Sequence, residues 1–105
     1  MTGSRGMVYV LALAVLCLMV VQSVSAQGGA DLFKQKCAMC HGPDGKGQTP
    51  MAKNMGTGSL ASSAVQGQSD VQLKNAILKG KGKMPAQKIT DAQASDVVKF
   101  IRTLK

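Results

Sequence analysis

The stretch Cys37-Ala38-Met39-Cys40-His41 decides the fold of this 105-residue chain. Two cysteines stand three positions apart and a histidine follows the second, which is the attachment pattern of c-type haem. Positions i and i+3 lie on one face of a helical turn, so both sulfurs can reach the two vinyl groups of one porphyrin. The next residue then lies beneath the ring. The pattern predicts a covalently bound haem c, attached through Cys37 and Cys40, with His41 as an iron ligand.

Two other uses of a C-x-x-C pair are less well supported. A structural zinc site needs four ligands, commonly with a second Cys or His pair, but the chain has a single histidine. A thioredoxin-like dithiol needs a βαβ framework around the two cysteines, and the sequence lacks strand-like runs for one. We therefore favour haem over zinc binding or dithiol chemistry.

The N-terminus, residues 1–26, has the layout of a secretory signal peptide that is cleaved. Arg5 provides a positive charge, an unbroken apolar run covers 7–21, and small residues at 24–26 form a cleavage site. A retained membrane anchor would need about 20 apolar residues, more than this run contains. A lipoprotein reading of Cys17 is weak because the residue before it is not small. We expect export to the periplasm or to an equivalent compartment such as a thylakoid lumen.

Cleavage would leave residues 27–105 as one small domain. Its formal net charge would be one unit below the +8 of the whole chain, and its aromatic residues would be Phe33 and Phe100 only. Domains of this size usually need an additional stabilising element, such as a covalent cross-link or a cofactor, because they bury little apolar surface. A covalent haem would provide that stabilisation, so we expect the haem-free chain to fold poorly.

Three segments after the leader have helical patterns. The first covers about 30–39, the second opens at a capping box in 69–72 and ends at Gly80, and the third opens at a capping box in 90–93. The apolar positions of the three helices are Leu32, Phe33 and Cys37; Val71, Leu73, Ile77 and Leu78; and Ala94, Val97, Val98, Phe100, Ile101 and Leu104. No strand pattern is visible. The predicted fold class is all-α, with three to four helices wrapped around one haem.

A long stretch from Gly42 to Gln68 separates the first two helices and is rich in Gly, Ser, Asn and Gln. A structureless loop of that length is uncommon in a compact domain. Wrapping around a cofactor would explain it, and a short helix at about 50–55 is a further expectation.

The second axial ligand of the iron has to come from a residue other than histidine, since His41 is the only one. Met84 lies in a glycine-rich loop, Lys79-Gly80-Lys81-Gly82-Lys83-Met84-Pro85, which can approach the ring and direct a thioether at the iron. Met39 is confined to the attachment turn. We expect Met84 to bind the iron, with Met55, a lysine or an open position as the alternatives.

The order of these motifs resembles that of short bacterial and photosynthetic class I c-type cytochromes, over essentially all of residues 28–105. The shared features are C-x-x-C-H, a proline-containing loop, the G-K-G-K-M-P segment and a terminal helix. The resemblance implies that the first and last helices cross, at the positions occupied by Gly29, Phe33, Val97 and Phe100.

The resemblance also implies that a proline carbonyl accepts a hydrogen bond from Nδ1 of His41. Pro50 is the best match for that role and Pro43 the second. Such a bond would fix the tautomer of the imidazole. The chain departs from the family in having no Trp, and no Tyr after the leader, which leaves the usual aromatic partners of the propionates without a match.

His/Met ligation favours ferrous iron and leaves no position for a substrate. Together with the resemblance, it predicts a soluble, monomeric one-electron carrier that turns over no substrate. A haem peroxidase or gas sensor would need an open distal site. A bound haem subunit of a larger dehydrogenase or oxidase is a further alternative, which the small size and the leader disfavour.

Lysines near the predicted haem site point to acidic redox partners. Lys79, Lys81 and Lys83 flank the methionine loop, and Lys34 and Lys36 precede the attachment motif. Such positive charge steers association with acidic proteins, for example a membrane oxidase, a reaction centre or a dehydrogenase. Nucleic-acid binding is disfavoured because no reading motif and almost no aromatic residues are present.

Overall fold

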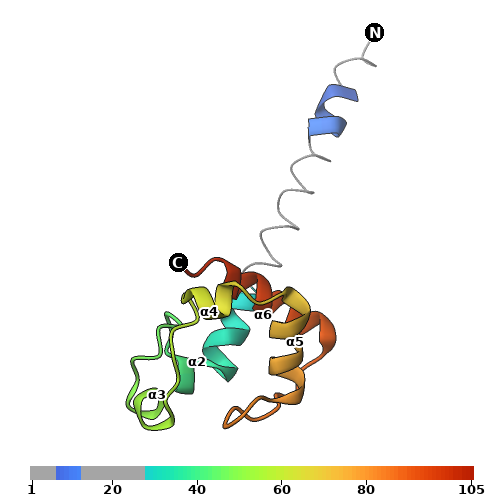
Figure 1. The fold of residues 1–105 in the computed structure, drawn as a ribbon. Helices are drawn as coiled ribbons and strands as arrows, with labels where there is room; N and C mark the ends of the chain where they lie inside the picture. Colours follow the sequence, from blue (N-terminus) through green and yellow to red (C-terminus); the bar gives the residue numbers. More distant parts are fainter. Residues whose placement is uncertain (1–6, 13–27) are drawn as a thin grey trace.

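A computed structural model describes residues 7–12 and 28–105 of the chain. The domain begins with a helical segment, 28–36, and contains no extended strand among these residues. The elements that follow are α2 (Ala38–His41), α3 (Pro50–Met55), α4 (Ser63–Gln66), α5 (Asp70–Lys79) and α6 (Asp91–Arg102) (Figure 1). The predicted all-α class is confirmed. The first helix ends earlier than predicted, because a turn at Cys37 separates it from α2.

Most of the predicted signal peptide lies outside the described residues, including Arg5, Cys17 and the cleavage site at 24–26. Residues 7–12 are helical, and their apolar side chains are exposed. In the part of the chain that the structure describes, no helix has the length and apolar character needed to cross a membrane.

Helices α5 and α6 begin at the two predicted capping boxes. The Ser69 hydroxyl accepts from the Gln72 amide at 3.2 Å, and the Gln72 side chain accepts from the Ser69 amide at 2.8 Å. Thr90 and Gln93 form the same reciprocal pair at 3.1 and 2.9 Å. Each box satisfies amides that have no partner within the helix, which explains why both helices start where the sequence predicts.

The core lies where α5 and α6 pack against the first helix. Its buried members are Phe33, Cys37, Leu73, Ile77, Ala94, Val97, Val98 and Ile101. The rings of Phe33 and Phe100 lie 4.9 Å apart between centroids and are tilted by 48°, a favourable aromatic geometry. These contacts confirm the predicted crossing of the first and last helices. Val71 is the exception among the predicted apolar positions, because it is 60% exposed on the outer face of α5.

The stretch from Gly42 to Gln68 is folded into short helices and turns. The predicted helix at 50–55 is present as α3: the Thr49 hydroxyl caps it by accepting from the Ala52 amide at 3.0 Å, and Pro50 is its first residue. Gly56 ends it in the left-handed conformation, with φ of 70°. Helix α4 was not predicted from the sequence. It is a single turn capped by Ser62.

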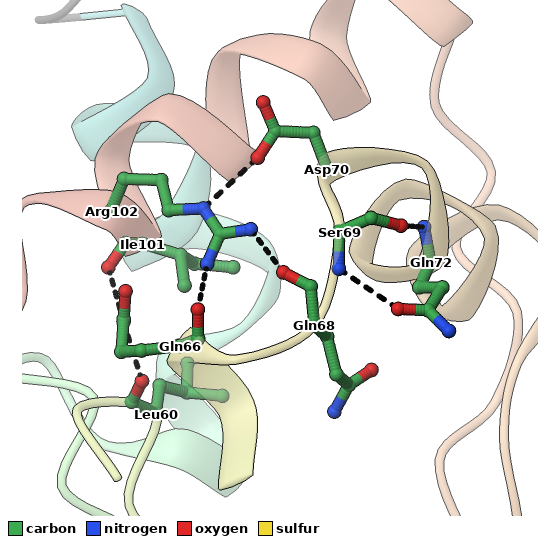
Figure 2. Close-up of polar contacts among 8 residues, drawn as sticks. All are labelled: Leu60, Gln66, Gln68, Ser69, Asp70, Gln72, Ile101 and Arg102. Atoms are coloured by element: carbon green, nitrogen blue, oxygen red, sulfur yellow. Dashed lines mark hydrogen bonds and ion pairs between the residues drawn. The ribbon is translucent and has the colours of Figure 1, made fainter. Parts of the chain in front are cut away.

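Arg102, near the end of α6, ties this helix to the segment between α4 and α5 (Figure 2). Its guanidinium donates to the carbonyl of Gln66 at 2.8 Å and to that of Gln68, and Nε lies 2.9 Å from Oδ1 of Asp70. The side-chain Nε2 of Gln66 in turn donates to the Ile101 carbonyl at 3.0 Å. The long stretch is thereby held against the C-terminal helix.

Candidate functional site

The two cysteines of the motif lie at the two ends of one helical turn, with Cys37 directly before α2 and Cys40 within it. The Cys37 amide donates to the Phe33 carbonyl at 2.8 Å, and the His41 amide donates to the Cys37 carbonyl at 3.0 Å. This helical path keeps the two sulfurs on one side of the chain. Cys37 is buried, Cys40 is half-buried, and both are free thiols. The pKa of Cys37 is raised mainly by burial of its side chain, and the nearby Cys40 contributes to the same direction.

His41 is held against the core by its own turn. Its ring centroid lies 6.3 Å from that of Phe33. Nδ1 is buried and has no hydrogen-bond partner, so Nε2 is the ring nitrogen left for a metal. Burial lowers the pKa of His41 and thereby favours the neutral imidazole, which is the form that binds metal ions.

The bond predicted from Nδ1 of His41 to the Pro50 carbonyl is absent from the structure. Pro50 is the first residue of α3, directly after the capping residue Thr49. Pro43 does not accept this bond either.

Thr49, which sequence reasoning missed, links the attachment turn to α3. Its hydroxyl lies 3.2 Å from the Cys40 carbonyl and 3.4 Å from the Met39 carbonyl, to which it can donate, while it accepts from the Ala52 amide. A threonine directly before a proline at a helix start is a capping signal in the sequence. That signal could have located the start of α3, but not its contact with the haem motif.

Met84 lies in a tight turn that follows α5. Its amide donates to the Lys81 carbonyl and its carbonyl accepts from the Lys81 amide, both at 3.0 Å. The side chain is half-buried and packs against the core. Figure 1 shows the loop after α5 extending toward the lower end of α2.

One cavity of about 480 Å³ brings the attachment motif and the methionine loop together. Its wall includes Cys37, Cys40, His41 and Met84. Met55, the alternative ligand, also lines it. The other lining residues are Gln35, Lys36, Met39, Gly56, Thr57, Lys81, Lys83, Pro85 and Gln87. The structure thus unites every residue predicted to hold the haem, apart from Pro50.

The residues around this cavity fit a haem. Two free thiols could attach a porphyrin covalently, and an imidazole and a thioether are side-chain groups that can bind haem iron. The volume is in the range of small-molecule and cofactor pockets. In the described residues, no group of three or more His, Cys, Asp or Glu side chains could hold a bare metal ion, so the zinc alternative gains no support.

Three of the five predicted lysines line the cavity: Lys36, Lys81 and Lys83. Lys34 and Lys79 are exposed but do not line it. None of the three is in a salt bridge found among the described residues, where Lys74–Asp91 and Arg102–Asp70 are the ion pairs. The cavity wall is therefore basic.

Comparisons with known proteins agree with this geometry. The family model "Cytochrome c" matches residues 26–105. Among solved structures, the chain is similar to the KustC0563 c-type cytochrome, with 28% sequence identity and a TM-score of 0.66, over 73% of this chain and 96% of that chain. No curated protein gave a match. The chain belongs to the cytochrome c family.

Membership of this family defines the fold, the cofactor and the general role of the chain. The fold is the all-α cytochrome c fold, and the cofactor is covalently bound haem c with its iron. The general role is that of a haem-c electron carrier, which exchanges electrons with redox partners. Proteins of this type are generally exported.

Proposed function

We propose that the domain of residues 27–105 is a one-electron carrier whose haem iron is held between His41 and Met84. The observation that carries the proposal is the shared cavity, whose wall contains the two cysteines, the histidine and the methionine. Sequence positions more than forty residues apart converge there because α5 returns the chain to the attachment turn.

Each residue has a separate task in this proposal. Cys37 and Cys40 hold the porphyrin covalently, and Nε2 of His41 binds the iron from the attachment turn. The thioether of Met84 would supply the second protein ligand of the iron. Bound haem c supplies an iron that alternates between the ferric and ferrous states. A thioether ligand favours the ferrous state and so raises the reduction potential.

The same ligand set argues against catalysis. With His41 and Met84 both bound, no position is left at which a substrate or oxygen could bind. Phe33 is buried with its ring centroid 6.3 Å from that of His41, and Met84 packs against the core. Electron exchange with other proteins, without turnover of a substrate, is the function that remains.

The partners in this proposal are acidic redox proteins, for example a membrane oxidase, a reaction centre or a dehydrogenase. Lys36, Lys81 and Lys83 at the cavity give the docking surface its positive charge. The proposal also includes export: residues 1–26 are removed as a signal peptide, and the carrier works as a monomer in the periplasm or an equivalent lumen.

The test is an absorption spectrum of periplasmically expressed protein, ferric and ferrous, with and without carbon monoxide. We expect a low-spin c-type spectrum that carbon monoxide leaves unchanged. Met84→Ala should open the site to carbon monoxide, whereas Met51→Ala, which alters a methionine outside the cavity wall, should not. Ready binding of carbon monoxide by the unmodified protein would contradict the carrier proposal and favour a sensor or peroxidase.

A retained low-spin state in Met84→Ala would identify a different sixth ligand. Met55 would then be tested next, because it lines the same cavity. A spectrum without haem would contradict the roles of Cys37 and Cys40.

A further inference from the structure

We propose that Gly80 and Gly82 are positioning residues for the distal ligand: they shape a turn that presents the Met84 thioether to the haem cavity before the iron is bound. This inference rests on the proposed role of Met84 as a ligand. Neither glycine touches the cofactor itself in this proposal, because neither lines the cavity.

The turn is a two-residue connection between Lys81 and Met84. These two residues exchange a pair of backbone hydrogen bonds, both 3.0 Å long. Gly82 has a φ of 58°, whereas Lys83 is not among the residues with positive φ. A positive φ at the first central residue alone is the pattern of a type II′ turn, which requires glycine at that place. Another residue at 82 would be strained.

Gly80 is required for a different reason. It ends α5 with a φ of 80°, and its amide donates to the Ala76 carbonyl at 3.0 Å. A Cβ atom at this position would lie 2.8 Å from the Met84 carbonyl oxygen and 2.9 Å from the Ala86 amide nitrogen. The backbone that carries Met84 thus lies directly against Gly80, and any side chain there would displace it.

The far end of the loop is fixed as well. The Gln87 amide donates to the Ile77 carbonyl at 2.8 Å, and the Gln87 side chain donates to the Pro85 carbonyl at 3.2 Å. Ile77 is a buried member of the core. Met84 is therefore held between two attachments to α5, one at Gly80 and one at Ile77.

This arrangement has a consequence for ligand binding. A thioether is a weak ligand for iron. If the loop were disordered before binding, the entropy cost of ordering it would cancel much of the free energy gained when Met84 binds the iron. A turn that is already closed avoids that loss. Strain at Gly82 or displacement at Gly80 should therefore loosen Met84 from the iron, even though no cavity-lining side chain is changed.

The experiment compares holoprotein variants Gly82→Ala and Gly80→Ala with the unmodified protein. A strained backbone residue costs enough to shift a local equilibrium by about tenfold. We expect the rate of carbon monoxide binding to the ferrous protein to rise about tenfold for Gly82→Ala, and further for Gly80→Ala. The reduction potential should fall in the same order.

Gly45→Ala is the matched control. Gly45 also has positive φ, at 72°, and the three atoms nearest to a Cβ there belong to the side chains of Leu104 and Leu60. It does not line the cavity. This variant should lower the thermal stability and leave both carbon monoxide binding and the potential unchanged.

The inference is overturned if the turn variants lose thermal stability as Gly45→Ala does, yet keep the unmodified rate and potential. If Gly80→Ala does not fold, Gly82→Ala decides alone, because a Cβ at Gly82 has no atom within 4 Å. Met84→Ala separates this inference from the proposed function. Failure of Met84→Ala to open the site refutes the ligand, whereas an open site in Met84→Ala with unaffected glycine variants refutes only the turn.

Discussion

Gly29 and Asp96 bring the first helix and α6 into direct backbone contact: a Cβ on Gly29 would lie 2.7 Å from the carbonyl carbon of Asp96. No L-residue with a side chain fits at that distance without moving one helix. The contact also sets the spacing at which Phe33 packs on Phe100 and Val97 becomes buried. The absence of a side chain at one position thus determines how closely the two ends of the domain pack.

Replacing Gly29 by alanine should therefore destabilise the holoprotein. The helices would have to separate by a fraction of an ångström, and overpacking of this kind costs roughly 1–3 kcal/mol in the free energy of unfolding. Thermal or denaturant unfolding of the ferric protein measures it. Gly28→Ala is the control, because a Cβ at Gly28 has no atom within 4 Å and alanine is the better helix former. Equal stability of the two variants would contradict the proposed packing.

Arg102→Met should destabilise the protein by about 1–3 kcal/mol, because it leaves the carbonyls of Gln66 and Gln68 without their donor. The ion pair with Asp70 contributes little to this, since the Asp70 side chain is 76% exposed. Asp70→Asn should accordingly cost less than about 1 kcal/mol. Urea unfolding of both variants tests the difference. A larger effect of Asp70→Asn would show that the ion pair, and not the carbonyl contacts, holds the segment (Figure 2).

Much of the fold could be predicted because its signals are local. The capping boxes at Ser69 and Thr90 and the apolar spacing of α6 depend only on nearby residues, and the structure confirms them. Val71 was misassigned because it fits the helical spacing of α5 while facing away from the other helices. Helix α4 was missed because one turn of four residues has too short a pattern to detect.

The site was predictable to the extent that it depends on motif chemistry. The spacing of Cys37, Cys40 and His41 and the loop around Met84 identify the residues of the cavity wall. The hydrogen bond from His41 to the Pro50 carbonyl is absent from the structure, and it was inferred from the family resemblance alone, with no local signal in this sequence for the direction of that carbonyl. The contact of Thr49 with the Cys40 carbonyl could not be predicted either, because it joins residues that only the folded loop brings together.

Charge at the cavity should control the rate of electron exchange. The double variant Lys81→Gln/Lys83→Gln should slow electron transfer with an acidic redox partner roughly threefold to tenfold at low salt, because it weakens electrostatic steering. The difference should shrink as the ionic strength rises. Stopped-flow kinetics measures both effects. Lys88→Gln/Lys99→Gln removes the same charge from residues that do not line the cavity, and an equal slowing there would point to net charge rather than a docking surface.

Removing the positive charge beside Met84 should also lower the reduction potential. Lys81 is paired with Met84 across the turn and lines the same cavity. A nearby cation stabilises ferrous iron relative to ferric iron, because the ferrous site carries one positive charge less. Lys81→Gln should therefore make the iron harder to reduce, most clearly at low ionic strength. Redox titration of Lys81→Gln measures the change, with Lys99→Gln as the control. Identical potentials in the two variants would show that the Lys81 ammonium is too far from the iron to affect it.

The haem-free chain should lack a cooperatively folded state. Cys37→Ala/Cys40→Ala would leave the cavity of about 480 Å³ without its cofactor, next to the core that Phe33 and Val97 form. Without the porphyrin, the apolar lining of the cavity stays in contact with water, and the hydrophobic stabilisation that its burial would give is lost. The whole stability of a small domain is about 5–15 kcal/mol. Circular dichroism during heating tests the expectation. A sharp, cooperative transition in the haem-free variant would show that the helices support themselves and that the haem serves only electron transfer.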